Sequence, residues 1–472
     1  MKIRLASAGH LSQLPPLGLY VHLPWCLRKC PYCDFNSHAL REDARASRGG
    51  SRAPSGRVHV LRSAVHALHP VPRARRGEAT DTAEATDAAE ATDTAEAPDA
   101  AEAAPSAGAD PGLDVGATSL PAALEQRYLA ALQADLEAAL PRVWGRSVQT
   151  VFIGGGTPSL FSPAAIEQLL AMVRARLRVA PNAEITLEAN PGTFEADRFR
   201  GFAAAGVNRL SIGVQSFDDA ALRAIGRVHD AAQARAAVAL AAQVFDTFNI
   251  DLMYALPGQT LEMLERDLDT ALSLSPPHLS CYQFTLEPNT YFARFPPPLP
   301  DDDLAAAMQD LVEARTAAAG LRQYEVSAYA RDGHRCRHNL NYWHFGDYLG
   351  IGAGAHGKIS SHECIVRQAR LRHPERYMEA AVSPAGAVEE ERVLSAADLP
   401  FEFMLNALRL VDGVPADLFE ARTGMSTARI ARMLDAGVRR GLLDEDPTRL
   451  RATALGRRFL NDLQQLFLEE TR

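Results

Sequence analysis

Short runs of apolar residues alternate along the chain with longer stretches in which apolar residues recur at helical spacing. This alternation is typical of repeated βα units, whose strands pair in parallel. Strands are predicted at 17–23, 148–153, 184–188, 209–214, 248–254 and 279–285, and amphipathic helices at 164–179, 231–244 and 261–274. Six such units in series indicate an α/β protein with an open (β/α)6 partial barrel, two units short of the usual closed barrel of eight.

The strand pattern stops near residue 395. Helical patterns follow at 399–410, 416–423 and 427–440, and a turn-rich stretch at 444–451 precedes a last helix. This order resembles a winged-helix module. A small, separate C-terminal α domain is therefore predicted for residues 395–472.

Residues 41–120 break the pattern on both sides. Their first half is rich in Ser and Arg, and their second half contains the six-residue repeat EATDTA EATDAA EATDTA EAPDAA. A repeat whose apolar positions are filled only by alanine cannot bury enough surface to offset the entropy of the chain. We predict a disordered, low-complexity insertion.

The net charge of −9 is concentrated in this insertion. Residues 78–102 contain nine acidic and no basic residues, so the rest of the chain balances 49 acidic residues against 49 Lys and Arg. Such a balance does not indicate a nucleic-acid or an anionic membrane partner. The first 16 residues include Lys2, Arg4 and His10 and no sustained apolar stretch, so no signal peptide or membrane span is predicted and the expected location is the cytoplasm.

Three of the six cysteines, Cys26, Cys30 and Cys33, follow the first predicted strand closely. This clustering does not resemble the disulfide framework of a secreted protein. Three thiolates can bind three irons of a four-iron, four-sulfur (4Fe-4S) cluster and leave the fourth iron open to a small chelating molecule. The alternative is a structural zinc site completed by His22, Asp34 or His38, for which this cysteine spacing is uncommon.

A glycine-rich loop, Gly154-Gly155-Gly156-Thr157-Pro158, follows the second predicted strand. Glycines let the backbone approach a ligand closely, and parallel α/β folds bind small molecules at the carboxyl ends of their strands. The loop is therefore a candidate cradle for the ligand of the open iron.

These motifs, together with four others, resemble those of the radical S-adenosylmethionine (SAM) coproporphyrinogen III oxidase family, and within it those of the haem-chaperone branch. The matching segments are 20–36 (YVHLPWC to CDFN), GGGTPS (154–159), LEANP (187–191), GVQSF (213–217), GRVHD (226–230) and DLMYALPGQ (251–259). They cover nearly all of the chain outside the insertion.

The resemblance implies a radical-SAM partial barrel in which the three cysteines hold the 4Fe-4S cluster. Contacts with SAM are implied for Tyr20, Gly155, Gly156, Thr157, Glu188, Gln215, Arg227 and Asp251, and Tyr32 is placed to pack on adenine. The expected division of the chain is 1–40 for the first strand and the cluster loop, 41–120 for the insertion, 121–290 for the rest of the barrel, 291–394 for a barrel-capping region, and 395–472 for the C-terminal domain.

Two features separate the branches of this family. The oxidases carry a further cysteine two residues after the third, where this chain has Phe35, so decarboxylation of coproporphyrinogen is not expected. The segment from His338 to Trp343 matches the HNxxYW signature of the haem-chaperone branch, and it supplies an imidazole beside aromatic rings that can pack on a porphyrin. His338 is the candidate haem ligand, with a buried structural histidine as the alternative, and Cys336 is a competing thiolate.

The resemblance also implies partners. Haem would be the cargo, client haemoproteins, among them respiratory enzymes, its recipients, and an unidentified electron donor would reduce the cluster, with at most peripheral membrane association. The enzymatic alternative is an oxygen-independent coproporphyrinogen III oxidase. An alternative of another class is a winged-helix nucleic-acid-binding protein, prompted by the C-terminal residues Arg422, Arg429, Arg432, Arg439 and Arg440.

Overall fold

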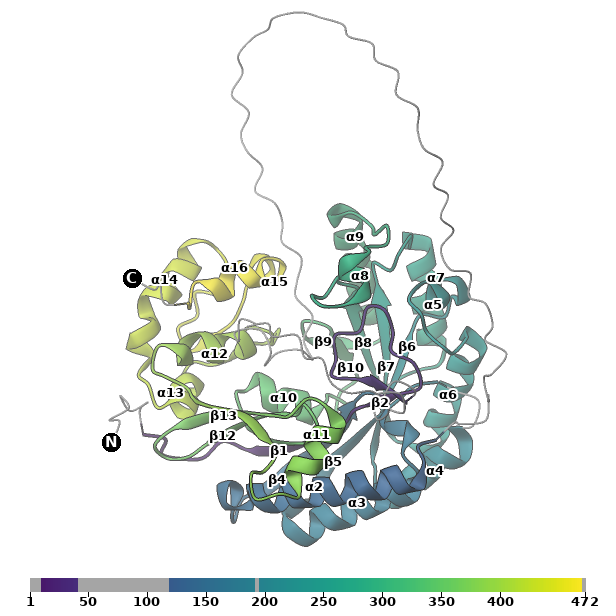
Figure 1. Ribbon diagram of the computed structural model, residues 1–472. Coiled ribbons are helices and arrows are strands. Elements are labelled where there is room, and N and C mark those ends of the chain that lie inside the picture. Colours follow the sequence, from purple (N-terminus) through teal and green to yellow (C-terminus); the bar gives the residue numbers. More distant parts are fainter. Residues whose placement is uncertain (1–9, 41–118, 192–194, 469–472) are drawn as a thin grey trace, which may run out of the picture.

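The computed structural model describes residues 10–40, 119–191 and 195–468 (Figure 1). The predicted insertion lies almost wholly outside the described residues, so its predicted disorder stays a prediction. None of the described helices is both long enough and apolar enough to cross a membrane.

Six neighbouring strands form the parallel centre of a twelve-stranded sheet. In spatial order they are β1 (Leu17–Leu23), β4 (Ser147–Gly155), β5 (Arg178–Ala189), β6 (Arg209–Gln215), β7 (Thr247–Tyr254) and β8 (His278–Gln283). All six predicted strands and the partial (β/α)6 barrel are thereby confirmed.

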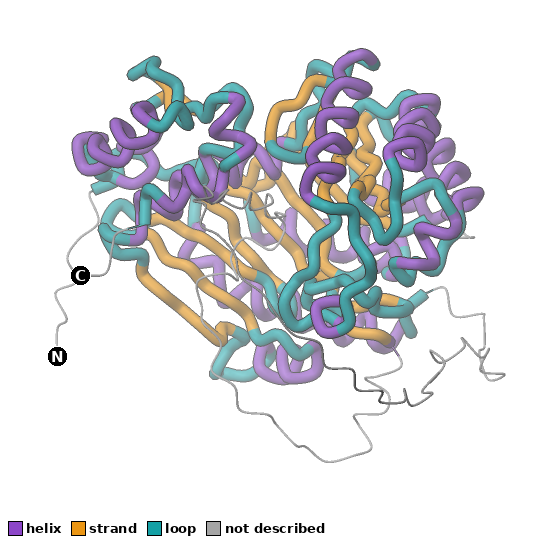
Figure 2. The backbone as a smooth tube through the Cα atoms, turned by 90° about the horizontal axis from the view of Figure 1, so that it is seen from above, coloured by secondary structure: helices purple, strands orange, loops and turns teal. Residues whose placement is uncertain are grey.

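Helices cover the outer face of the barrel (Figures 1 and 2). They include α2 (Ala122–Val143), α3 (Pro163–Arg176), α4 (Glu195–Ala205), α5 (Asp219–Ala224), α6 (Ala231–Val244) and α7 (Leu261–Ser273). The predicted helix at 164–179 runs too far, because the chain turns at Leu177 and β5 begins at Arg178. The apolar Val179 there belongs to the strand and not to the helix.

The region predicted to cap the barrel adds strands to both edges of the same sheet. On one edge, β11 (Asp347–Ile351) pairs in parallel with β1 and is followed by the antiparallel β12 (His356–Ser360), β13 (Ile365–Arg370) and β14 (Val388–Val393). The other edge carries β10 (Ala328–Ala330) and β9 (Arg322–Glu325). The helices of this region are α8 (Tyr291–Arg294), α9 (Asp302–Ala318), α10 (Arg337–Trp343) and α11 (Pro374–Ala381).

The C-terminal segment packs around a second hydrophobic core that includes Leu399, Phe403, Phe419 and Leu460 (yellow in Figure 1). Its elements are α12 (Asp398–Ala407), α13 (Asp417–Thr423), α14 (Ala431–Arg439), α15 (Ala454–Arg458), α16 (Leu460–Gln465) and the short pair β15 (Val414–Pro415) and β16 (Arg449–Leu450). The predicted order of helices and turn-rich stretch is observed, but two short helices, α15 and α16, stand where one last helix was predicted.

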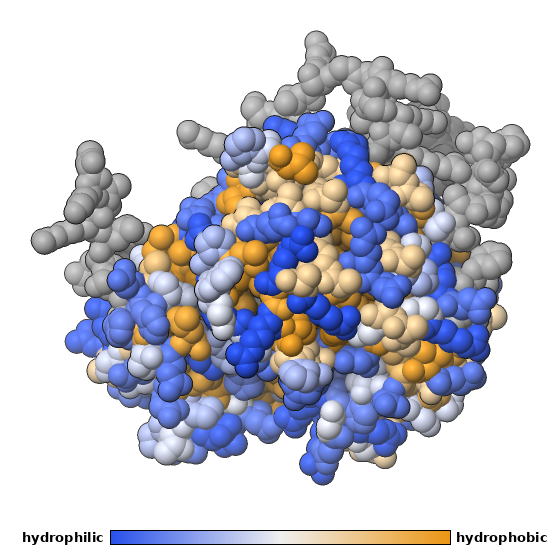
Figure 3. Space-filling view, turned by 90° about the horizontal axis from the view of Figure 1, so that it is seen from below, coloured by the Kyte–Doolittle hydropathy of each residue, from blue (hydrophilic) through white to orange (hydrophobic). Residues whose placement is uncertain are grey.

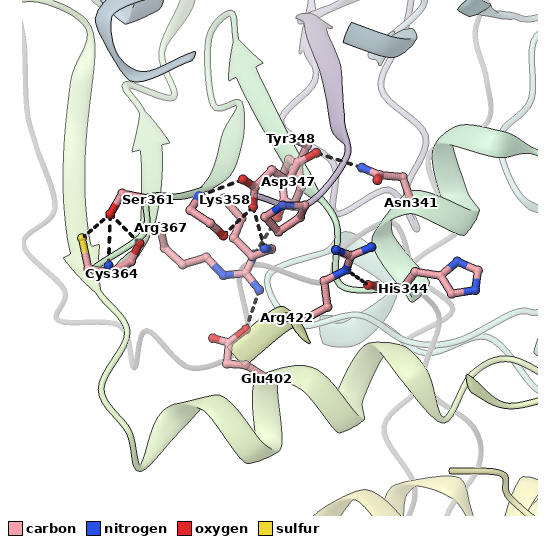
Figure 4. Close-up of polar contacts among 12 residues, drawn as sticks. Asn341, His344, Asp347, Tyr348, Lys358, Ser361, Cys364, Arg367, Glu402 and Arg422 are labelled. Atoms are coloured by element: carbon pink, nitrogen blue, oxygen red, sulfur yellow. Dashed lines mark hydrogen bonds and ion pairs between the residues drawn. The ribbon is translucent and has the colours of Figure 1, made fainter. Parts of the chain in front are cut away.

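Paired charges join this domain to the sheet, in a region that we call the junction (Figure 4). Glu402 on α12 accepts hydrogen bonds from Arg367 on β13 and from Arg392 on β14. Nearby, the buried Asp347 on β11 forms ion pairs with Lys358 (2.9 Å) and Arg146 (2.8 Å). Each buried charge of the junction therefore has an opposite charge in contact with it.

The inside of the partial barrel is polar. Alternate residues of β6 and β7, such as Leu210, Ile212 and Ile250, belong to the hydrophobic core, as in other α/β barrels. The residues between them line a cavity of about 740 Å³ and include Arg209, Ser211, Asn249, Asp251, His278 and Ser280. The barrel therefore encloses space for a polar ligand instead of a packed apolar centre.

The outer surface is largely hydrophilic. Figure 3 shows the face seen from below, where hydrophilic side chains predominate and hydrophobic ones appear between them. The described chain exposes only scattered large apolar side chains, among them Leu27, Phe35 and Val228, which line the cavity described above.

Candidate cluster and cofactor site

The cysteine loop and the glycine loop are held together by their backbones. The Cys26 residue lies on the short strand β2 (Trp25–Cys26), directly after β1. The amides of Gly156 and Thr157 donate to the carbonyls of Leu23 (2.8 Å) and Trp25 (2.7 Å). A Cβ atom on Gly156 would lie 2.6 Å from the Trp25 carbonyl oxygen, so only glycine permits this approach.

Each of the three thiols has a hydrogen-bond partner beside its sulfur. Thr157 Oγ1 donates to Cys26 Sγ (3.4 Å), and Cys33 Sγ lies 3.7 Å from Ser37 Oγ. The guanidinium of Arg227 lies 3.9 Å from Cys30 Sγ. Burial raises the pKa of Cys26 and raises that of Cys33 to about 11, so these sulfurs need a metal to be held as thiolates.

The thiols fit a cluster better than a single zinc ion. A structural zinc site requires four ligands that converge on one ion. In an iron–sulfur cluster, by contrast, each thiolate binds an iron of its own. His22, one candidate fourth zinc ligand, has both ring nitrogens engaged, by the Tyr20 hydroxyl (3.0 Å) and the Asn36 carbonyl (2.9 Å).

Arg227 reaches the cysteine loop from the segment after α5. Its Nη2 atom donates to Asn190 Oδ1 and to the Gly213 carbonyl, both at 2.6 Å. Asn190 also donates to Thr157 Oγ1 (2.8 Å), so it joins the arginine to the glycine loop. Asn190 was not singled out from the sequence, although the LEANP motif that contains it was the available signal.

Two buried carboxyl groups face the same cavity. Glu188 accepts from the Gly155 amide (3.1 Å), and burial followed by the repulsion of Asp251 raises its pKa to about 7. Asp251 accepts from Asn249 (2.7 Å) and Ser211 (3.2 Å), while burial raises its pKa above the usual value. Two acids in a low-dielectric cavity favour a ligand that brings positive charge or hydrogen-bond donors.

Aromatic and strained residues complete this end of the cavity. Tyr32 lies against Phe284, with ring centroids 5.7 Å apart. Gln215 has a φ of 71°, an unfavourable conformation for a residue with a side chain, and accepts from the Tyr282 hydroxyl (2.7 Å). Backbone strain of this kind is typical of functional sites. Tyr20, the remaining predicted SAM contact, has its pKa raised by burial and by Glu188.

His338 lies at the inner end of the cavity and is only 1% exposed. Its Nδ1 atom pairs with Thr150 Oγ1 and its Nε2 atom with the Tyr342 hydroxyl, both at 2.8 Å. Burial, followed by the charge of Arg209, lowers its pKa to about 3, so the imidazole is neutral. A neutral imidazole can bind iron, but only after one of these two partners has moved.

Cys336, the competing thiolate, has a less suitable environment. Burial raises the pKa of its thiol to about 12, and its sulfur faces Glu184 Oε1 at 3.7 Å. It does not line the cavity, whereas the thirteen predicted site residues all do: Tyr20, Cys26, Cys30, Tyr32, Cys33, Gly155, Gly156, Thr157, Glu188, Gln215, Arg227, Asp251 and His338.

A partial (β/α)6 barrel with a three-cysteine loop held against a glycine loop defines the radical-SAM class. Residues 126–271 match the family model of the radical SAM superfamily, and residues 394–459 match that of the HemN C-terminal domain. Proteins of this class bind a 4Fe-4S cluster and SAM.

Full-length relatives identify the family. The chain is 41% identical to the heme chaperone HemW of Escherichia coli, over 98% of this chain and 100% of that protein. It is 39% identical to the heme chaperone HemW of Haemophilus influenzae over the same shares. The chain belongs to the HemW family. The coproporphyrinogen III oxidase HemN of Escherichia coli, at 20% identity, has the same fold, with a TM-score of 0.69 over 97% of this chain and 91% of that one.

Proposed function

We propose that this chain is a radical-SAM haem chaperone that binds haem and transfers it to client haemoproteins. The observation that carries the proposal is a single cavity of about 740 Å³, which is lined both by the three cysteines and by His338, Tyr342 and Trp343 of the HNxxYW helix. The relatives are heme chaperones of the HemW family, which supports haem as the cargo.

Cys26, Cys30 and Cys33 would hold the cluster, which when bound supplies the electron for reductive cleavage of SAM. The hydrogen bonds from Thr157 and Arg227 stabilise negative charge on the sulfurs. Arg227 also suits the carboxylate of SAM, Glu188 and Asp251 suit its amino and ribose groups, and Tyr32 offers a face for adenine. The backbone amides of the glycine loop fix the distance between these groups and the cysteines.

His338 is the proposed axial ligand of the haem iron. For Nε2 to bind iron, the Tyr342 hydroxyl has to give up its hydrogen bond, while Thr150 keeps Nδ1 and orients the ring. Tyr342 offers aromatic surface to the porphyrin, whereas the Trp343 ring packs in the second hydrophobic core beneath Arg409. Phe35 occupies the position of the additional cysteine of the oxidases and supports a chaperone over a coproporphyrinogen oxidase.

The partners follow from this proposal. The recipients are haemoproteins, among them respiratory enzymes, and a separate electron donor reduces the cluster. The chain acts in the cytoplasm, with at most peripheral contact with the membrane.

The test is a haem titration of the anaerobically reconstituted protein and three variants. Wild type is expected to bind haem with a shifted Soret band, and His338→Ala to bind about tenfold or more weakly with an altered band. Tyr342→Phe frees Nε2 and is expected to bind at least as tightly as wild type. His344→Ala is the control, because His344 follows the same helix and has its Nδ1 atom engaged by the Leu340 carbonyl (2.7 Å), but does not line the cavity.

The outcomes separate the two parts of the proposal. Absence of haem binding by the cluster-loaded wild type would refute the chaperone function. Equal affinity and an unchanged band in His338→Ala would remove His338 from the site but leave the cargo in place. In the same preparations Cys30→Ala is expected to lose the iron and acid-labile sulfide of the cluster, and a full complement in that variant would refute the cluster assignment.

A further inference from the structure

Among the described residues, four lysine or arginine side chains are buried to 5% exposure or less: Arg209, Lys358, Arg370 and Arg409. Three of them have a carboxylate in contact. Lys358 pairs with Asp347 (2.9 Å), Arg370 with Asp135 (2.8 Å) and Arg409 with Glu325 (3.2 Å). Arg209 forms no ion pair and its side chain makes no hydrogen bond within the described part of the chain, and its Nε atom is buried without an acceptor.

The position of Arg209 makes this exception informative. It is the first residue of β6, it lines the cavity, and its charge acts on both His278 and His338. Buried charges in folded proteins are normally in contact with an opposite charge, whereas Glu184 and Asp251 act on Arg209 without contact. An unpaired charge that borders a cavity indicates that the partner arrives from outside the chain.

The acidic residues that act on Arg209, Glu184 and Asp251, accept hydrogen bonds from other groups. Glu184 accepts from the backbone amides of Arg337 (3.0 Å) and His338 (2.9 Å) at the start of α10. Asp251 accepts from Asn249 and Ser211. Burial lowers the pKa of Arg209, but Cys336 and Glu184 nearby outweigh this effect and raise it above its usual value, so the guanidinium stays charged.

We propose that Arg209 binds a carboxylate group of the ligand that occupies the inner end of the cavity. The guanidinium can donate two parallel hydrogen bonds to a carboxylate, which is the geometry for which arginine is selected. The assignment rests on the proposed function: with haem as the cargo, the carboxylate is one of its two propionates. The other possible source of the same group is the carboxylate of a SAM molecule.

The test compares haem with its dimethyl ester, in which both propionates are methylated, and adds SAM as a third probe. Wild type is expected to bind haem about tenfold or more tightly than the ester. Arg209→Met is expected to weaken haem binding by about the same factor while affinity for the ester stays unchanged. Arg209→Lys keeps the charge but loses the paired donors. Its affinity for haem is expected to lie between those of wild type and Arg209→Met.

Arg370→Met is the matched control, because it also removes a buried guanidinium but lies outside the cavity. It is expected to keep the preference for haem over the ester while it lowers the melting temperature, since Asp135 is left unpaired. Arg209→Met is expected to lower the melting temperature less. This difference separates a ligand-binding arginine from one that only supports the fold.

The remaining outcomes are distinguishable. If Arg209→Met weakens SAM binding and not haem binding, the carboxylate is that of SAM and the assignment of Arg209 stands. If the variant changes the affinity for neither ligand, the inference is wrong. If wild type binds neither porphyrin, the proposed function fails, and the SAM titration alone decides the role of Arg209.

Discussion

Two buried polar regions of this molecule, the junction and the cavity, differ in whether their charged side chains are in contact with an opposite charge. At the junction, Asp347 is in contact with both Lys358 and Arg146, and Glu402 with both Arg367 and Arg392. In the cavity, Glu188 and Asp251 face each other without a cation in contact, and Arg209 has no carboxylate in contact among the described residues.

This difference in pairing distinguishes charged groups that stabilise the fold from charged groups that are available to bind a ligand. Desolvated charges are tolerated when they are paired, and the junction satisfies this condition from within the chain. In the cavity Glu188, Asp251 and Arg209 have no opposite charge in contact, so a bound ligand can still pair with them.

The largest effect on the free energy of unfolding is expected when a charge is removed from the junction. Asp347→Asn leaves Lys358 and Arg146 without their carboxylate and weakens the bonds from Ser360. We expect a loss of about 3–5 kcal/mol in the free energy of unfolding, measured by denaturant titration. A loss below about 1 kcal/mol would show that the junction is not held by its charges.

Removal of the Glu188 carboxylate from the cavity is expected to raise the free energy of unfolding instead. The folded-state pKa of Glu188 is about 7 against an ordinary value of 4.5, so the folded protein holds this proton more tightly than the unfolded chain. Without SAM, the stability that this proton provides is complete below pH 4.5 and is lost as the pH rises through 7. Relative to wild type, Glu188→Gln should therefore gain up to about 3 kcal/mol between pH 4.5 and pH 8.

The measurement is denaturant unfolding of wild type and Glu188→Gln across this pH range. The same variant should bind SAM more weakly, because the carboxylate is lost from the cofactor site. A difference in unfolding free energy that does not change with pH would contradict the raised pKa of Glu188.

The smallest effect is expected at the exposed edge of the junction. Arg392 contacts Glu402 (3.2 Å) and Asp398 (3.4 Å), and its side chain is 37% exposed. Such pairs contribute at most about 1 kcal/mol, and Glu402 keeps Arg367 as a partner. Arg392→Ala should therefore lower the free energy of unfolding by less than about 1 kcal/mol, and a larger loss would extend the paired network to the surface.

Much of the barrel could be predicted from the sequence because its signals are local. The predicted strand at 17–23 and the helix at 231–244 match β1 and α6 to the residue, since apolar periodicity marks both elements. The strands at the edges of the sheet lacked this signal. β14 reads VEEERV and is almost wholly exposed, so only its pairing with β13 makes it a strand.

The residues that line the cavity could be predicted in part from the motifs, but their contacts could not, and their roles in binding a cluster and SAM stay predictions. The motifs identified the cysteines, the glycine loop and the acids, and the structure brings all of them to one cavity. Sequence alone could not show that His338 has both nitrogens engaged, because Thr150 is 188 positions away in the chain. Nor could it show that Arg209 lacks a carboxylate partner, which depends on how β6 and α10 pack.

The cysteine loop is closed by the chain immediately around it. Trp25 and Cys26 pair with His38 and Ala39 of β3 (His38–Ala39), and the His38 amide donates to the Pro24 carbonyl (2.7 Å). Backbone pairing between residues 24–26 and 38–39 thus closes the cysteine loop before residue 41. Evolution can lengthen, shorten or replace the sequence that follows without disturbing the three sulfurs, and the long repetitive segment found there is the kind of growth that this early closure permits.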